Sequence, residues 1–359
     1  MKQSTDANDI LQSHGEDALR ARSDRAQKYR RPMDGAFRPA KGIDMSADEL
    51  CAKIFPPVKY VVPGYIVEGL TLLAGKPKAG KSWLVLHAAL AVARNGFTLG
   101  DVCCPQGDVL YCALEDTWRR LQRRLRKLLG GEPAPKSLTL RVDLPRLAEG
   151  GLDAIRAWIE RADNPRLIVV DVLAKVRDHS QRNDQGHYAA DYAAMQGLKE
   201  LADRYGIAIV VVHHLRKMDA EDPLDQISGT TGLAGSADTV LVLHKSGTGV
   251  TLKGRGRDIE EIDKAVLFNK NACTWTVVGE ANEVEQATVQ GSILSILHEA
   301  KAPLSPQEVT DLCANATLAN VRKSLARMEK NRKVIKVRYG QYIHPDRDDL
   351  NPSMRERSL

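Results

Sequence analysis

The fold of this chain follows from one stretch, Gly75-Lys76-Pro77-Lys78-Ala79-Gly80-Lys81-Ser82. It matches the phosphate-binding loop pattern G-x-x-x-x-G-K-[ST] at every fixed position. An apolar run at 70–74 precedes it and a Leu- and Ala-rich segment at 83–94 follows it, so we expect a buried strand, the loop and then a helix. This order places backbone N–H groups and a helix N-terminus around the phosphates of a nucleotide.

The loop predicts both the ligand and its metal ion. Lys81 is expected to reach the β- and γ-phosphates, and the Ser82 hydroxyl is expected to hold Mg²⁺. ATP and Mg²⁺ are therefore the expected cofactors. The residues expected to bind the nucleotide are Gly75, Lys76, Pro77, Lys78, Ala79, Gly80, Lys81, Ser82 and Trp83.

Composition narrows the class of protein. The 359 residues allow two or three domains, and a hydrophobic content of 43% is enough for a core. No apolar run approaches the roughly 20 residues of a membrane span, and the N-terminus has no secretory pattern. The six cysteines have neither a C-x-x-C pair nor disulfide-like spacing, which predicts a cytoplasmic location. The net charge of +6 permits a nucleic acid partner without establishing one.

Apolar runs alternate with helical patterns through the middle of the chain. This alternation predicts an α/β fold with a mostly parallel sheet that is covered by helices on both faces. Short strands after residue 243 predict an antiparallel extension of the sheet. Strands are expected at 108–114, 167–170, 207–212, 239–243, 250–252, 264–269 and 273–278, and helices at 118–129, 152–162 and 188–205.

Two acidic residues stand at the ends of predicted strands, where parallel sheets place their chemistry. Asp171 closes the apolar strand 167–170 in the Walker B pattern and is expected to orient Mg²⁺ through water. Glu115 ends the strand before it and is a candidate general base that polarises the attacking water. A capping role is the alternative for each. Asp116 is expected to be the N-cap of the helix that follows.

His213 and His214 end the next strand along the chain. A residue at this place can sense the γ-phosphate and pass its presence to nearby loops. The alternative is a pair of structural histidines. Metal binding is less favoured, because no Cys or further His lies at ligand spacing.

The order of these motifs resembles that of the RecA-fold ATPases, in particular the RepA-type helicases of plasmids and phages. The resemblance covers about 60–278 and includes the loop, 113–116, Asp171, 212–214 and 227–238. It implies a hexameric ring with ATP between subunits. It also implies Glu115 as the catalytic base and His213 or His214 as the phosphate sensor.

The resemblance further implies an arginine that acts on the ATP of a neighbouring subunit. The stretch at 253–258 occupies the place of that arginine in the family. We favour Arg257 as this arginine finger, with Lys253 and Arg255 as secondary candidates, because a planar guanidinium suits a γ-phosphate at an interface. The alternative is a basic hairpin that contacts only solvent or DNA.

Three further segments have open interpretations. By resemblance, the loops 177–187 and 217–231 face a central channel and hold single-stranded DNA, but neither carries the aromatic platforms typical of base stacking. Ordinary surface loops are the alternative. The helix at 118–129 has an apolar stripe expected in the core and a basic face that is either solvated or in contact with a subunit or nucleic acid. The basic residues are Arg119, Arg120, Arg123, Arg124, Arg126 and Lys127.

The chain is expected to divide into four parts. Residues 1–45 form a polar arm, either disordered or gripping a neighbouring subunit or DNA, and 46–284 form the RecA-like ATPase domain. Residues 285–345, with helices near 286–298 and 317–330, a capping box at 305–308 and a hairpin at 333–343, form a winged helix-turn-helix. This domain binds either DNA or protein, and 346–359 form a disordered tail. Its candidate phosphate contacts are Arg322, Lys323, Arg327, Lys330, Lys336 and Arg338.

We therefore expect an ATP-driven, ring-forming motor, most simply a DNA helicase that moves on single-stranded DNA in plasmid, phage or mobile-element replication. Duplex DNA and a primase or initiator protein are further expected partners, and no membrane is expected. The alternative is an ATP-gated DNA-binding regulator of replication or transcription that acts through the winged helix. A filament-forming recombinase is less favoured, because no separate N-terminal polymerisation domain is apparent.

Overall fold

The computed structural model describes residues 45–55, 57–177, 184–215, 233–246, 249–313, 316–338 and 340–351, with only the backbone of 184–190. Residues 1–44 of the N-terminal arm, 178–183 of the first predicted channel loop, all of the second (217–231) and 352–359 of the tail lie outside these residues. The chain divides into two units, Met1–Pro56 and Pro57–Leu359, and each is described by itself. In the first, Ser46 caps helix α2 (Ala47–Ala52) through a capping box with Glu49.

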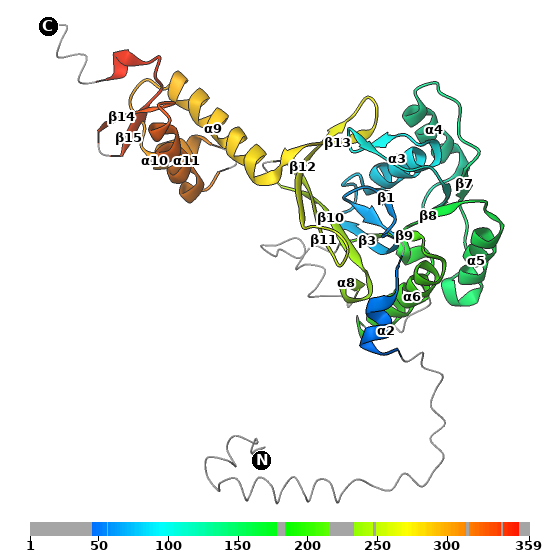
Figure 1. Cartoon of the computed structure of the whole chain (residues 1–359). Coiled ribbons are helices and arrows are strands. Elements are labelled where there is room, and N and C mark those ends of the chain that lie inside the picture. Colours follow the sequence, from blue (N-terminus) through cyan, green and yellow to red (C-terminus); the bar gives the residue numbers. More distant parts are fainter. Residues whose placement is uncertain are drawn as a thin grey trace, which may run out of the picture. The chain divides into compact units, whose positions relative to one another are not determined.

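The second unit is built around a nine-stranded sheet, counted over the described residues (Figure 1). Its order is β13-β12-β11-β10-β3-β9-β8-β6-β7. The six strands from β10 to β7 pair in parallel, and β10, β11, β12 and β13 pair antiparallel. This confirms the predicted mostly parallel sheet with an antiparallel extension. The strands are β3 (Gly69–Gly75), β6 (Asp108–Ala113), β7 (Leu138–Arg141), β8 (Pro165–Asp171), β9 (Ala208–His214), β10 (Thr239–Lys245), β11 (Val250–Gly256), β12 (Ile262–Asn269) and β13 (Thr274–Glu280).

Helices cover both faces of the parallel part. Alternate residues of each central strand enter two separate apolar clusters, as the two-residue period of a strand requires. In β9, for example, Val210 and Val212 pack with α3 (Lys81–Arg94), whereas Ile209 and Val211 pack with α5 (Gly151–Arg161) and α6 (Asp184–Tyr205). Because both faces are covered, these strands appear in the sequence as unbroken apolar runs.

Smaller elements complete this part of the chain. Two-stranded sheets pair β1 (Tyr60–Val62) with β2 (Ile66–Val67), and β4 (Phe97–Thr98) with β5 (Val102–Cys103). Short helices are α8 (Leu233–Ser236), η1 (Leu147–Glu149), η2 (Leu173–Lys175) and η3 (Asp348–Leu350). Among the described residues, no helix has the length and apolar character needed to span a bilayer.

Helix α4 (Trp118–Leu129) differs from the prediction at its start. Its N-cap is Thr117, whose side chain accepts a hydrogen bond from the N–H of Arg120, so the prediction of Asp116 as the cap was wrong. Asp116 instead forms ion pairs with Arg120 and Arg124. Trp118, expected in the core, is 58% exposed, because the buried face of the helix begins one turn later at Leu121.

The C-terminal segment forms three helices and a two-stranded sheet. These are α9 (Ala281–Glu299), α10 (Pro306–Leu312), α11 (Leu318–Lys330), β14 (Ile335–Arg338) and β15 (Gln341–Ile343). A third apolar cluster joins α9 and α11 through buried residues such as Ile293 and Leu325. The capping box of Ser305 and Glu308 is present as predicted.

Two details concern the limits of this segment. β13 ends at Glu280 and α9 begins at Ala281, so the limit expected between 284 and 285 lies within α9. The tail is also described as far as residue 351. There Arg347 donates hydrogen bonds to the carbonyl oxygens of His298 and Ala300, which ties the tail to the end of α9.

Trp275 of β13 provides a test of the antiparallel extension. Its side chain is 3% exposed, lies 4.9 Å from the ring centre of Phe268, and its indole N–H donates to the carbonyl oxygen of Gly80 at 3.2 Å. We expect Trp275→Ala to lower the free energy of unfolding by about 3–5 kcal/mol, because it empties a packed site. Urea unfolding measures this change. The matched control Trp118→Ala should stay within about 0.5 kcal/mol of the parent, and an equal loss in both variants would contradict the assignment.

Candidate nucleotide site

The phosphate loop runs from the end of β3 to the first two residues of α3, and close packing shapes it. A Cβ atom at Gly75 would lie 2.6 Å from the carbonyl oxygen of Leu243 in β10. A Cβ atom at Gly80 would lie 2.7 Å from Cζ2 of Trp275, and Gly80 has a φ of +97°. Both glycines are therefore required by their neighbours as well as by the motif.

Lys81 is the buried cation of the site. Its Nζ atom donates to the carbonyl oxygens of Gly75 at 2.7 Å and Lys76 at 3.0 Å. It also lies 3.1 Å from Nδ1 of His214. Burial lowers the pKa of Lys81 to about 8, although the negative charges of Asp171 and Glu115 oppose the shift. The ammonium thus fixes the conformation of the loop by hydrogen bonds to its backbone.

Asp171 lies at the end of β8, beside Ser82. Burial raises its pKa, and hydrogen bonds from Tyr111 and Ser82 act in the opposite direction. The Tyr111 hydroxyl donates to Oδ2 of Asp171 at 2.7 Å, and burial raises the pKa of Tyr111 well above its usual value. Sequence reasoning missed Tyr111. The available signal was a single hydroxyl-bearing ring inside an otherwise apolar strand that ends beside the loop.

Glu115 and His214 meet at the same edge of the sheet. Nε2 of His214 lies 3.7 Å from Oε2 of Glu115, whose side chain is 51% exposed. Since the other ring nitrogen of His214 contacts Lys81, one imidazole connects the candidate base to the phosphate-binding lysine. The structure therefore brings Lys81, Ser82, Glu115, Asp171 and His214 together.

His213 belongs to a different environment. Successive residues of a strand point to opposite faces of the sheet, so the side chain of His213 lies on the face opposite to that of His214. Burial lowers its pKa, and the negative charge of Asp191 opposes the shift. Asp191 is itself buried and pairs with Arg177 at 2.8 Å. Of the two histidines, His214 is the one that lines the nucleotide cavity.

Arg257 lies at the opposite edge of the sheet from the loop. In the strand register, Gly75 aligns with Leu243, whereas Gly256 pairs with Thr239 at the other end of β10. The Arg257 guanidinium is 69% exposed and its Nη1 lies 3.7 Å from Oδ1 of Asp238. A single chain therefore does not bring this arginine to its own loop.

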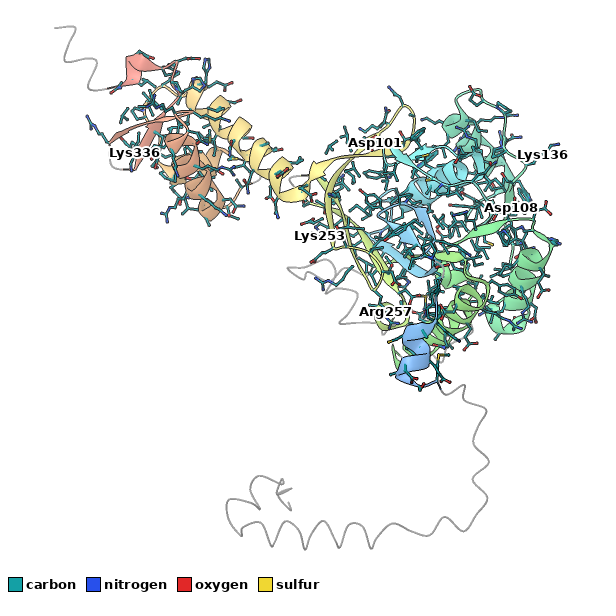
Figure 2. The ribbon with its side chains drawn as sticks, in the orientation of Figure 1. Asp101, Asp108, Lys136, Lys253, Arg257 and Lys336 are labelled. Carbon is teal, nitrogen blue, oxygen red and sulfur yellow. The ribbon has the colours of Figure 1, made fainter. Side chains whose placement is uncertain are left out.

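The other two basic candidates lie on β11, which ends one residue before Arg257, and they share one face of that strand because they are two residues apart. Lys253 pairs with Asp263 at 3.7 Å, and Arg255 pairs with Glu261 at 3.0 Å. Figure 2 labels Lys253, on this strand, and Arg257, directly after it.

A cavity of about 660 Å³ lies between the phosphate loop and α4. Sequence reasoning left the basic face of α4 open between solvent and a partner, and the structure places part of it in the cavity wall. The guanidinium of Arg124 lies 4.6 Å from the ring centre of Trp83. The cavity residues are Lys78, Ala79, Gly80, Lys81, Ser82, Trp83, Arg120, Arg123, Arg124, Lys127 and His214.

This fold and loop define a P-loop protein with a RecA-like core. The AAA_25 family model, described as an AAA domain, matches residues 36–220, just over half of the chain, and the chain belongs to this family. The family match and the arrangement around the loop confirm the prediction of a RecA-fold P-loop ATPase.

Curated relatives share the name DNA repair protein RadA. The protein of Escherichia coli K12 is 25% identical over 325 residues, and that of Salmonella typhimurium LT2 has the same identity. Each alignment covers 88% of this chain and 64% of the relative, so the chain spans less than two thirds of their length. A solved structure of an ATPase domain matches with a TM-score of 0.45 and 12% identity, covering 58% of this chain and 84% of that one.

The pKa of Lys81 is directly testable. We expect its amine in the nucleotide-free chain to react half-maximally with an acylating reagent near pH 8. In the urea-unfolded chain, the same peptide should titrate near the ordinary lysine value of about 10.4. Mass spectrometry of the labelled peptide measures both profiles. Because the folded pKa is the lower one, the cost of burying the charge is complete below pH 8 and disappears as the pH rises through the unfolded value.

Tyr111→Phe tests the hydrogen bond to Asp171. Without the hydroxyl, the carboxylate loses a donor that stabilises its charged form, so the pKa of Asp171 should rise further. A ¹³C NMR titration of the carboxyl carbon measures the change. Phe keeps the ring, so the midpoint of urea unfolding controls for folding. An unchanged titration would show that Tyr111 does not act on Asp171.

Proposed function

We propose that this chain is an ATP-hydrolysing, ring-forming DNA helicase. The observation that carries the proposal is the separation of its chemistry between two edges of one sheet. Lys81, Ser82, Asp171 and Glu115 lie at the loop edge, whereas Arg257 lies exposed at the other. One chain therefore supplies only part of a catalytic site at its loop edge. A neighbouring subunit would complete that site by placing its own Arg257 edge against the loop. A homo-oligomer, a hexamer by family resemblance, satisfies this geometry.

At the loop edge, each residue has a proposed role. Lys81 exchanges the carbonyl oxygens of Gly75 and Lys76 for phosphate oxygens. The Ser82 hydroxyl and the Asp171 carboxylate are adjacent hard oxygen donors and fit Mg²⁺, which would neutralise phosphate charge when bound. Glu115 orients and polarises the attacking water. His214, between Lys81 and Glu115, senses the γ-phosphate.

At the far edge, Arg257 is the proposed finger for the neighbour's ATP. Asp238 holds it only loosely, at 3.7 Å, since this carboxylate also accepts hydrogen bonds from the Leu70 N–H and Lys199 at 2.9 Å. Because the Arg257 side chain is exposed, an ion pair of this length costs little to break. Arg255 and Lys253, which share a face of β11, are the secondary candidates.

The C-terminal segment is the proposed winged helix. Its three helices and hairpin support this assignment, with domain limits near 46–284 and 285–345 for the ATPase and winged parts. Arg327 hydrogen-bonds Gln286 of α9, so Arg322, Lys330 and the hairpin residues Lys336 and Arg338 are better placed to contact duplex DNA or protein. Lys336 is labelled in Figure 2.

The proposed setting is replication of a plasmid, phage or mobile element in the cytoplasm. Single-stranded DNA is the proposed track, and a primase or initiator protein is a proposed partner. The RadA relatives are named as DNA repair proteins, and this name is in keeping with a setting in DNA metabolism.

The winged helix also favours a second candidate, an ATP-gated DNA-binding regulator. A helicase should hydrolyse ATP faster with single-stranded DNA and should unwind a forked duplex. A regulator should prefer one duplex sequence and unwind nothing. ATPase assays with and without single-stranded DNA, combined with forked-duplex unwinding, separate the two functions.

Mixed oligomers test the shared site. We expect Lys81→Ala to abolish hydrolysis, and Arg257→Ala to lower it by roughly 10³-fold or more while nucleotide still binds. Mixing the two inactive variants should restore part of the activity, because some interfaces then combine an intact loop with an intact arginine. Arg255→Ala separates the two candidates, because it should leave hydrolysis near the parent level if Arg257 is the finger. Full turnover by Arg257→Ala rings, or no recovery on mixing, would remove Arg257 from the mechanism.

A further inference from the structure

The wall of the nucleotide cavity opposite the phosphate loop is made of hydrogen-bond donors. Arg120, Arg123, Arg124 and Lys127 all come from α4. Among the described residues that line the cavity, none is an Asp, Glu, Asn or Gln. Arginine and lysine side chains donate hydrogen bonds and cannot accept them. The wall therefore suits a ligand surface that carries acceptors.

The acceptors nearest this wall are already occupied. Asp116 pairs with both Arg120 and Arg124, and the carbonyl oxygen of Glu115 accepts from Arg120. Lys127 donates to the carbonyl oxygen of Lys270. Arg123 makes no hydrogen bond or ion pair within the described part of the chain, so its guanidinium is available to a ligand.

The cavity also contains a flat surface. The Arg124 guanidinium covers the Trp83 ring at 4.6 Å, and its pairing with Asp116 fixes it there. Planar guanidinium groups and indole rings both stack on nucleobases. Because the loop at 75–82 is expected to bind the phosphates of a nucleotide, its base is expected to bind on the α4 side of the cavity.

Purine bases differ at the edge such a wall would contact. Guanine presents two acceptors, N7 and O6, and arginine binds both at once. Adenine presents one acceptor and one donor, N7 and the N6 amino group, which glutamine or asparagine matches and arginine does not. A wall of donors leaves the adenine amino group without a partner.

We propose that Arg123 reads the N7/O6 edge of a purine base stacked at Arg124 and Trp83, so that the site accepts GTP at least as well as ATP. The inference rests on the proposed nucleoside triphosphatase function and names its substrate class. It makes Arg123 a specificity-determining residue and leaves the phosphate chemistry of Lys81 unchanged.

The test is competitive binding of nucleotides to the full-length protein. We expect GTP and ITP, which share N7 and O6, to bind at least as tightly as ATP, and 7-deaza-GTP to bind more weakly than GTP. Arg123→Gln should shift the ratio of GTP to ATP affinity toward ATP by between about fivefold and 150-fold, the range for one bidentate contact. A gain in ATP affinity cannot result from misfolding.

Two controls complete the design. Arg126→Gln removes a charge from the same helix, but Arg126 lines a neighbouring cavity and not this one. This variant should leave the ratio of GTP to ATP affinity unchanged. Arg123→Lys keeps the charge but loses the fork, so the GTP preference should fall without a gain for ATP. ATP binding tenfold tighter than GTP binding, or an Arg123→Gln ratio equal to that of the parent, overturns the inference and leaves the ATPase proposal intact. If no nucleoside triphosphate binds, the proposed function itself fails.

Discussion

The buried ammonium of Lys81 is the interaction on which the site depends. An isolated cation inside a protein is costly, so it must be paired or hydrogen-bonded. Here the two loop carbonyls and His214 surround it, and Asp171 and Glu115 contribute negative charge. The contacts with the carbonyl oxygens hold the loop backbone around the ammonium. In the proposed function, phosphate oxygens take the place of these carbonyl oxygens.

The sheet distributes the remaining chemistry between its two edges. Parallel strands bring Glu115, Asp171 and His214 to the carboxyl-terminal edge, where β3 delivers the loop. The antiparallel strand β11 runs back and carries Arg257 to the other edge. The extension also supports the loop directly, through Trp275 against Gly80. One sheet thus holds the two complementary halves of the proposed interface site.

Much of this arrangement was predictable from local pattern. The loop, the alternation of apolar runs and helices, and the strand-end positions of Glu115 and Asp171 depend on short stretches of sequence, and the structure agrees with them. The errors at α4 arose where side chains compete. Asp116 and Thr117 are both good caps, and the arginines of the following turns bound Asp116, which left the cap to Thr117.

Other features needed contacts between residues far apart in the chain. Tyr111 is an ordinary strand residue until β6 and β8 align and place its hydroxyl against Asp171. The histidine pair is ambiguous until the strand turns His214 toward Lys81 and His213 toward the other face. The basic helix has a distinct role only once its arginines stand across a cavity from the loop.

The sequence by itself determined the class of the fold and the nature of the ligand, because a glycine loop between strand and helix has one common chemical use. Only the tertiary structure decided which side chains share the cavity, which histidine faces the lysine, and that Arg257 lies away from its own loop. The physical reason is that local pattern sets backbone conformation. Strand register and the packing of helices on the sheet set which distant side chains meet.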